Sequence, residues 1–264
     1  MPKVKLVSVD EDVVSVLRAS KLVGDNLILP GTLDRVMYEK VAKVLKKIGL
    51  KWNSKLKCHQ GVAGAADAVK AVIMAGEVVD EKQTYQFFET PPDVAAMMVS
   101  AANIMNSHKV LEPSAGNGSI VKAIFGKHPD LEMMCAIELN PKMIPELRAM
   151  ASTFLANHLV VLEEDFLQHN GHYDRIVMNP PFTKGQDCMH VRHAYDLLNP
   201  GGRLISIMSR SWVGNSLRKF KEFKEWFNLL ETQGLAYATC LPEGTFKDSG
   251  TMIGTLLVGV EKMA

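Results

Sequence analysis

The spacing of apolar residues predicts a small mixed unit in the first third of the chain. Apolar positions three and four apart predict an amphipathic helix over residues 32–48. Short apolar runs at 50–52 and 56–59, separated by a polar turn, predict a hairpin, and the alanine-rich stretch 61–74 predicts a second helix. We therefore expect a small α+β unit over residues 1–82.

From residue 83 onward, short apolar runs alternate with helical patterns, an order typical of a parallel sheet. Thr90 and Pro91 predict the start of the first helix, with Thr90 as its N-cap. Two apolar runs near the end of the chain predict a terminal hairpin. The predicted strands lie at residues 109–112, 133–137, 159–162, 176–178, 203–208, 237–241 and 252–260. This alternation predicts an α/β domain over residues 83–264.

The fourth of these strands runs directly into Asn179-Pro-Pro-Phe182. Neither proline can donate a backbone hydrogen bond and each fixes its own φ, so the chain leaves the sheet as a stiff loop. Such a loop would hold the Asn179 side-chain carbonyl and the Pro180 backbone carbonyl as two acceptors, with the Phe182 ring beside them. That arrangement suits a planar group with an exocyclic amine, since bases stack on aromatic rings. A merely structural loop that ends a strand is the alternative.

The first strand of the same domain leads into Glu112-Pro-Ser-Ala-Gly-Asn-Gly118 and then a predicted helix. A strand, a Gly-x-Gly turn and a helix open a nucleotide-binding βαβ unit. The dinucleotide fingerprint needs a third glycine where this chain has Val121, so the sequence disfavours NAD. The Glu112 carboxylate just before the glycines would repel a pyrophosphate and suits a cationic or amine-bearing ligand.

Acidic residues also follow the next two strands. Glu138 lies about twenty residues past the glycines, where a carboxylate can accept from the hydroxyls of a ribose. Asp165 can accept from an adenine amino group, and the Phe166 ring can cover an adenine face. The carboxyl ends of strands in an open α/β sheet line one crevice, so we expect these side chains to lie together.

In this order, Phe88-x-Thr90-Pro91, the glycine turn, Glu138, Asp165-Phe166 and the Asn-Pro-Pro-Phe loop resemble the motifs of S-adenosylmethionine-dependent amino-group DNA methyltransferases. The likeness is greatest to adenine-specific enzymes, including small members encoded by phages and plasmids. It covers residues 83–264. The resemblance implies a class I methyltransferase fold, which is a Rossmann-like, mostly parallel seven-stranded sheet with an antiparallel terminal hairpin. It also implies S-adenosylmethionine as cofactor and duplex DNA with a flipped adenine as substrate.

The resemblance assigns roles residue by residue. It implies that the catalytic set is Asn179, Pro180, Pro181 and Phe182. It places Thr90 at the methionine moiety of the cofactor. The implied cofactor contacts are Phe88, Thr90, Glu112, Ser114, Gly116, Gly118, Glu138, Asp165, Phe166 and Asn179.

Three other readings share parts of this pattern. Protein glutamine N5-methyltransferases also combine Asn-Pro-Pro and an aromatic residue with a helical N-terminal unit, but the Phe-x-Thr-Pro segment and the basic N-terminal unit count against them. RNA adenine or guanine N-methyltransferases also use Asn-Pro-Pro-Phe. A nucleic-acid module that has lost its cofactor is disfavoured by the intact cofactor motifs.

The net charge of +1 conceals a basic segment between residues 35 and 57, which has eight basic residues and one acidic residue. A solvated lysine face is the alternative to a phosphate-contacting surface. A second basic segment with interleaved aromatics covers residues 210–224. The residues expected to contact DNA are Lys43, Lys46, Lys47, Lys51, Arg210 and Lys219. Large members of the resembled family have a separate recognition domain, so we expect a short or relaxed target sequence here.

The four cysteines lie far apart, and neither a signal peptide nor an apolar run of about 18 residues is present, so a reduced, cytoplasmic protein is expected. Cys188, His190 and His193 share a predicted helix, and two histidines three apart can bind zinc. No further ligand pair accompanies them, so we expect no metal.

Overall fold

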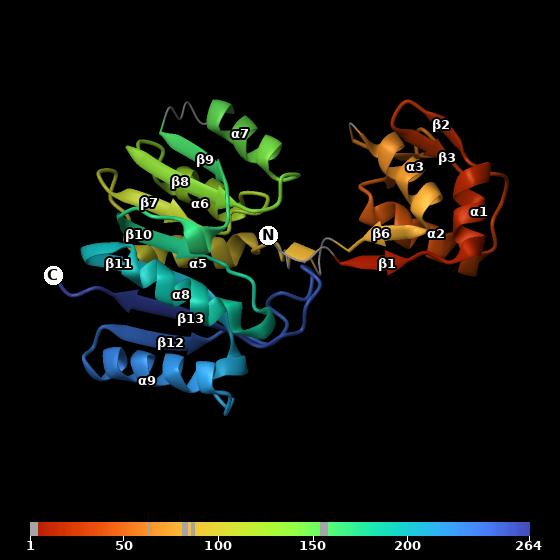
Figure 1. Cartoon of the computed structure of the whole chain (residues 1–264). Coiled ribbons are helices and arrows are strands. Elements are labelled where there is room, and N and C mark those ends of the chain that lie inside the picture. Colours follow the sequence, from red (N-terminus) through yellow and green to blue (C-terminus); the bar gives the residue numbers. More distant parts are fainter. Residues whose placement is uncertain (1–4, 63, 81–83, 86–87, 154–157) are drawn as a thin grey trace. The chain divides into compact units, whose positions relative to one another are not determined.

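The computed structural model divides into two compact units, Met1–Thr84 and Tyr85–Ala264 (Figure 1). Each unit has its own buried core and is described by itself. None of the helices in the described parts is long and apolar enough to cross a membrane. The structure describes residues 5–62, 64–80, 84–85, 88–153 and 158–264.

In the first unit, helices pack on a four-stranded antiparallel sheet of order β2-β3-β5-β4, and β1 pairs separately with β6. The Asp34 carboxylate caps α2 by accepting from the Met37 N–H at 2.9 Å. Apolar side chains such as Leu27, Val41 and Leu45 are fully buried between the sheet and the helices. The elements are β1 (Leu6–Ser8), α1 (Glu11–Ala19), β2 (Lys21–Val23), β3 (Asn26–Ile28), α2 (Arg35–Lys47), β4 (Lys51–Asn53), β5 (Cys58–Gln60), α3 (Ala65–Ala75) and β6 (Glu77–Val79).

The predicted hairpin and both predicted helices of this unit are confirmed, as β4–β5, α2 and α3. The apolar spacing did not reveal α1 or the strands β1, β2, β3 and β6. Each of these strands is three residues long, which is too short for an alternating pattern to emerge.

The second unit is built on a seven-stranded sheet of order β12-β13-β11-β10-β7-β8-β9. Strands β11, β10, β7, β8 and β9 are parallel, and β13 is antiparallel to both of its neighbours. This confirms the expected Rossmann-like class I methyltransferase sheet with an antiparallel terminal hairpin. The elements are α5 (Pro92–Ala102), β7 (Lys109–Glu112), α6 (Ser119–Lys127), β8 (Met133–Glu138), α7 (Ile144–Thr153), β9 (Leu159–Glu163), β10 (Tyr173–Met178), α8 (Gln186–Asp196), β11 (Leu198–Ser209), α9 (Arg218–Thr232), β12 (Ala236–Cys240) and β13 (Thr255–Glu261).

Helices cover both faces of this sheet (Figure 1), which is why the buried stretches of its central strands, such as residues 176–178, are apolar. Successive residues of β7 show the division, because Val110 packs with α5, α6 and α7 whereas Leu111 packs with α8 and α9. Glu112 and Glu138, in contrast, lie at the carboxyl ends of their strands. Their position at the strand ends defines the candidate site.

One local prediction was wrong. Helix α5 begins at Pro92 with Pro91 in the N-cap position, and the Thr90 side chain makes no cap hydrogen bond. The Thr90 hydroxyl instead accepts a hydrogen bond from Asn179 Nδ2, 89 residues away along the chain.

Candidate active site

The four parallel strands β7, β8, β9 and β10 bring their carboxyl ends to one edge of the sheet. Glu112 and Glu138 are the last residues of β7 and β8. Asp165 follows the end of β9 by two residues, and Asn179 follows β10 directly. The structure thus brings together four side chains that the sequence predicted to share a crevice.

The glycine turn after β7 is held against Glu138. The Gly116 N–H donates to Glu138 Oε2 at 2.7 Å, and the Asn140 N–H donates to Oε1 at 2.6 Å. Gly118 has a φ of +78°, and a Cβ at this position would lie 2.6 Å from Met150 Sδ. A side chain at residue 118 would therefore be both strained and in collision, so the turn depends on glycine here.

The Glu112 carboxyl group is almost completely buried, and its Oε2 has no hydrogen-bond partner among the described residues. Burial, and then the charge of Glu138, raises the pKa of Glu112 well above its usual value. Burial also raises the pKa of Glu138, although the N–H groups of Asn140 and Gly116 oppose this shift. A buried and a half-buried carboxyl group on neighbouring strands favour a ligand that brings donors or positive charge.

The Asn179 amide is oriented by the segment that precedes α5. Its Nδ2 donates to the Phe88 carbonyl at 3.2 Å and to Thr90 Oγ1 at 3.1 Å. Since a carbonyl can only accept, this pairing defines which end of the amide is nitrogen. Oδ1 is then the amide atom that can accept a hydrogen bond from a ligand.

This segment is itself tied to two other loops through Glu89. The Glu89 carboxylate accepts from Asn117 Nδ2 at 2.7 Å, within the glycine turn, and from Ser119 Oγ at 3.4 Å. The Glu89 carbonyl accepts from Ser249 Oγ at 2.6 Å. The sequence motifs did not single out Glu89, Asn117 or Ser249. Their position inside or beside recognised motifs was the only available signal.

The predicted catalytic loop, residues 179–182 (hereafter the catalytic loop), is also fixed by the core and by backbone geometry. Pro180 is buried, and Phe182 is half-buried against the core cluster beneath α5 and α6. Lys184 and Gly185 have φ values of +58° and +74°, so the chain reverses sharply after Phe182. A Cβ on Gly185 would lie 2.7 Å from Phe220 Cε1.

Behind this loop, a fully buried carboxylate joins α8 to β11. Asp187 accepts from the Ser209 N–H at 2.9 Å and from Ser209 Oγ at 2.8 Å. Burial raises the pKa of Asp187, and the Ser209 hydrogen bonds oppose the shift. No sequence motif pointed to this residue, because its role is to hold the loop rather than to contact a ligand.

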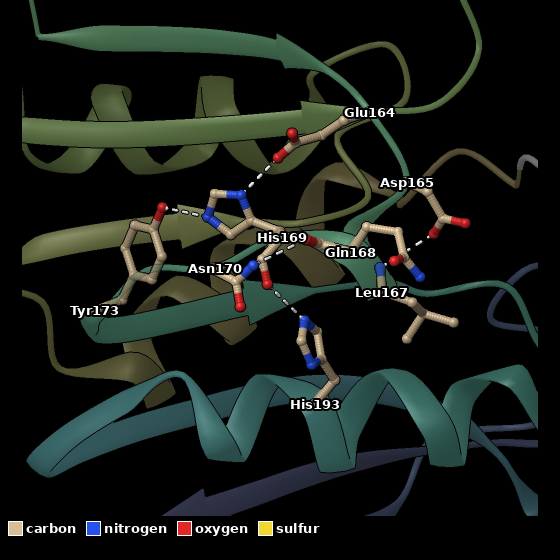
Figure 2. Close-up of polar contacts among 8 residues, drawn as sticks. All are labelled: Glu164, Asp165, Leu167, Gln168, His169, Asn170, Tyr173 and His193. Atoms are coloured by element: carbon tan, nitrogen blue, oxygen red, sulfur yellow. Dashed lines mark hydrogen bonds and ion pairs between the residues drawn. The ribbon is translucent and has the colours of Figure 1, made fainter.

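A hydrogen-bonded chain fixes the connection between β9 and β10, which carries Asp165 (Figure 2). His169 Nδ1 lies 2.5 Å from Glu164 Oε1, and His169 Nε2 lies 2.8 Å from the Tyr173 hydroxyl. Asp165 Oδ1 accepts from the Leu167 N–H at 3.1 Å and leaves its other oxygen for a ligand.

The Phe166 ring is 3% exposed. It packs against the rings of His190 and His193, with centroid distances of 5.4 and 4.8 Å. These contacts leave almost none of the Phe166 ring accessible for the predicted stacking of an adenine. Ser114, another predicted contact, is half-buried in the glycine turn.

Burial lowers the pKa of His190 to about 4, so this side chain is neutral at neutral pH. Burial likewise raises the pKa of the neighbouring Cys188 thiol. Within the ranges that the structure describes, no three His, Cys, Asp or Glu side chains are grouped as metal ligands.

The expected DNA contacts differ in their surroundings. In the first unit, Lys43, Lys46 and Lys51 are exposed, whereas Lys47 Nζ lies 2.6 Å from Asp80 Oδ2 in a largely covered ion pair. In the second unit, Arg210 and Lys219 are exposed. Lys219 Nζ donates to the Lys184 carbonyl, directly after the catalytic loop.

Comparison with known proteins matches residues 87–234 to a family model described as a methyltransferase small domain. The methyltransferase subunit of a type I restriction-modification system from Streptococcus thermophilus has a similar fold, with a TM-score of 0.58 and 17% identity over 75% of this chain and 49% of that one. A putative RNA methyltransferase from Pyrococcus horikoshii (TM-score 0.51, 16% identity, 68% of this chain and 88% of that one) is also similar. A dimethyladenosine transferase from Plasmodium falciparum is similar as well, with a TM-score of 0.50 and 16% identity over 67% of this chain and 64% of that one. The chain spans about half the length of the restriction-modification subunit, and these identities show a shared fold alone.

Proposed function

The chain belongs to the methyltransferase small domain family, and its methyl donor is S-adenosylmethionine. We propose that it methylates the N6 amino group of adenine in DNA. The orientation of the Asn179 amide is the observation that carries the proposal. With Nδ2 engaged by Phe88 and Thr90, Oδ1 remains to accept a hydrogen bond beside the Pro180 carbonyl and the Phe182 ring. Two acceptors next to an aromatic ring suit a flat group that carries an amine.

The edge of the sheet fits the cofactor. Glu138 would accept from the ribose hydroxyls with the lone pairs that Gly116 and Asn140 leave unused. The unpartnered Oε2 of Glu112 would accept from the amine of the methionine moiety. Thr90 Oγ1 accepts from Asn179, and its own O–H can still donate to that moiety.

The chain's own residues would act on the substrate amine. S-adenosylmethionine, when bound, supplies a methyl group whose bond to sulfur breaks as the amine nitrogen bonds to the carbon. Asn179 Oδ1 and the Pro180 carbonyl would accept hydrogen bonds from the two N–H groups of the amine. These bonds draw the nitrogen lone pair out of conjugation with the ring. These acceptors also stabilise the positive charge that develops on the nitrogen. The methylated cation then loses a proton to water, so no strong base is required.

Adenine in DNA is the substrate that best combines these features with the charge of the first unit. Lys43, Lys46 and Lys51 are exposed and can contact phosphates without sequence preference. A base that is paired within a duplex cannot reach a site at the carboxyl ends of the β-strands, so the adenine would flip out at a cost of a few kcal/mol. Stacking on the half-buried Phe182 ring would offset about 1–3 kcal/mol of that cost.

A methyl-transfer assay tests the proposal. Wild-type protein and Asn179→Ala are each supplied with tritiated S-adenosylmethionine and one of three substrates: unmethylated duplex DNA, total RNA or a glutamine-containing peptide. The labelled product is hydrolysed and identified by mass spectrometry. We expect N6-methyladenine in DNA from the wild type and very little from the variant, because the variant lacks one of the two acceptors.

Label that enters only RNA would move the proposal to an RNA adenine or guanine methyltransferase. Label that enters only the peptide would move it to a glutamine N5-methyltransferase. In both cases Asn179 should still be required, since each reaction uses a planar group with an amine.

A further inference from the structure

The connection between β12 and β13 presents two adjacent apolar side chains to solvent. Met252 is 70% exposed and Ile253 is 50% exposed. Single exposed apolar residues are common on protein surfaces, but two in succession at the edge of a candidate active site are unusual. Figure 1 shows this connection at the edge of the sheet where β10 and β11 end.

The loop that carries this pair is held in place by internal contacts. Phe246 is 2% exposed and belongs to the same core cluster against which Phe182 packs. The Thr251 N–H donates to the Phe246 carbonyl at 3.1 Å, and the Ile253 N–H donates to Thr251 Oγ1 at 3.2 Å. The buried Phe246 ring and these hydrogen bonds therefore fix the loop conformation in which Met252 and Ile253 are exposed.

Two anchors place the pair beside the catalytic loop. On one side, Ser249 Oγ donates to the Glu89 carbonyl at 2.6 Å, and the residues flanking Glu89 accept from Asn179. On the other side, the Gly254 carbonyl accepts from the Arg210 N–H at 2.9 Å, directly after β11. Met252 and Ile253 lie between these anchors.

Arg210 contacts the segment that carries the pair, and two further cationic side chains follow the loop of residues 179–182. The Arg210 side chain packs against Gly254, because a Cβ placed on Gly254 would lie only 2.9 Å from Arg210 Cδ. Arg210 is exposed and carries a positive charge. Lys184 and Lys219 are exposed after the catalytic loop and linked through the Lys184 carbonyl. An apolar tip beside the cationic Arg210 matches a nucleic-acid duplex, whose base stack is apolar and whose phosphates are anionic.

We propose that Met252 and Ile253 form a wedge that enters the DNA duplex at the position the flipped adenine leaves. Proteins that kink or open duplexes insert side chains such as Met, Ile, Leu and Phe between bases. Here the wedge would fill the gap, while Arg210, Lys184 and Lys219 contact the neighbouring phosphates. The inference rests on the proposed adenine methylation of DNA, and it explains how the base would be kept out of the stack.

The test compares two forms of one DNA. Unmethylated DNA made by amplification is used as a duplex and after heat denaturation with rapid cooling, and methyl transfer is measured for wild type and for Met252→Ser with Ile253→Ser. We expect kcat/KM to fall at least tenfold on the duplex and less than twofold on denatured DNA. A wedge is needed only where a base pair must be opened.

Two further variants define the controls. Met105→Ser with Met263→Ser changes two exposed methionines, one just before β7 and one just after β13. Both positions lie at the sheet edge opposite the site. Methyl transfer to duplex DNA and to denatured DNA should therefore stay unchanged. Met252→Leu with Ile253→Leu keeps an apolar tip and should retain most duplex activity. Cofactor affinity, measured by calorimetry, should be equal in all four proteins.

Equal duplex activity in the serine variant and the wild type would overturn the wedge while leaving adenine methylation intact. An equal loss on both DNA forms would also overturn it, because the loop would then shape the active site rather than open the duplex. If wild type methylates neither form of DNA, the proposed function itself fails and the wedge fails with it.

Discussion

The two units of this protein use charge in opposite ways. In the second unit, the carboxyl groups of Glu112, Glu138 and Asp187 are withdrawn from water at the ends of strands or helices. In the first unit, the pair between Lys40 and Asp10 is exposed, and the more covered Lys47 ammonium is neutralised by Asp80. Withdrawing a carboxylate from water is costly unless the group is bonded or serves a ligand, whereas an exposed pair costs and contributes little. A buried carboxyl oxygen without a partner in the described parts of the chain, as in Glu112, is therefore evidence for a chemical site, whereas a hydrogen-bonded carboxylate such as Asp187 can be structural. Exposed charge is evidence only for attraction.

The hydrogen bonds sharpen this contrast. Glu138 accepts from two backbone N–H groups, and Asp187 accepts from both the backbone and the side chain of Ser209. Glu112 is the exception, because one of its oxygens has no partner within the described residues. A ligand is the simplest explanation for a buried carboxyl group in this state.

The largest effect should come from Asn179→Ala. This change removes an acceptor that acts mainly in the transition state, so turnover should fall by about 10²–10³ while S-adenosylmethionine binding survives. Single-turnover methyl transfer and calorimetry measure the two quantities separately. Near-normal turnover in this variant would falsify the proposed role of the amide.

Thr90→Val supplies a graded control for the same site. It removes one acceptor of the Asn179 Nδ2 and leaves the Phe88 carbonyl in place. One neutral hydrogen bond contributes about 0.5–1.5 kcal/mol, so turnover should fall by about tenfold or less. A reduction as large as that of Asn179→Ala would mean that Thr90 has a direct role in the reaction.

Glu138→Ala should act on cofactor binding and not on the chemical step, and it should weaken S-adenosylmethionine binding at least tenfold, or about 1.4 kcal/mol. The variant removes the predicted ribose acceptor and also frees the Gly116 N–H that holds the glycine turn. Calorimetry of the purified protein measures the affinity without any nucleic acid. An unchanged affinity would remove Glu138 from the cofactor site.

Glu112→Gln should raise the stability of the cofactor-free protein. The folded-state pKa of Glu112 is raised, so folding favours the protonated form and the charged form costs stability as the pH rises above the ordinary carboxyl value of 4.5. Below that value both folded and unfolded forms are protonated, and the substitution should make little difference. Each kcal/mol recovered would raise Tm by about 2–4 °C. Thermal unfolding at neutral and acidic pH checks the sign, and a Tm that falls at neutral pH would show that the carboxylate is stabilising.

How far the sequence predicted the site follows from the same physics. Glu112, Glu138, Asp165 and Asn179 could be grouped in advance because parallel strands end at one edge of a sheet. The chain order of their strands was then enough to predict that they meet. The paired strands in the structure confirm that arrangement.

The partners of Asn179 could not be predicted in this way. A local rule placed Thr90 as a helix cap, but its hydroxyl accepts from an amide 89 residues away. Long-range hydrogen bonds of this kind leave no periodic trace in the sequence. The same limit hid the pairing of β1 with β6, which joins two strands far apart in the chain.

Surface lysines of the first unit should give the smallest effect on chemistry. Replacing Lys43, Lys46 and Lys51 together with Gln should leave cofactor affinity and turnover on saturating DNA unchanged, because none of them lies in the unit that holds the site. DNA affinity should fall for all sequences alike, since phosphate contacts carry no sequence information. The log–log dependence of binding on salt should flatten by about 0.9 for each phosphate that is no longer neutralised, or at most about 2.7 for the three lysines.

Lys47→Gln is the matched control for this last prediction. It removes one positive charge from α2, the helix that also carries Lys43 and Lys46, but the Lys47 ammonium is paired with Asp80 at 2.6 Å and is largely covered. If phosphates are contacted by exposed lysines, Lys47→Gln should leave the salt dependence unchanged while the triple variant flattens it. Fluorescence anisotropy with a labelled duplex across a range of salt concentrations measures both. A change in Lys47→Gln about one third as large as that in the triple variant would mean that only the total charge of the unit matters. An unchanged slope in both would mean that DNA is held by the second unit alone.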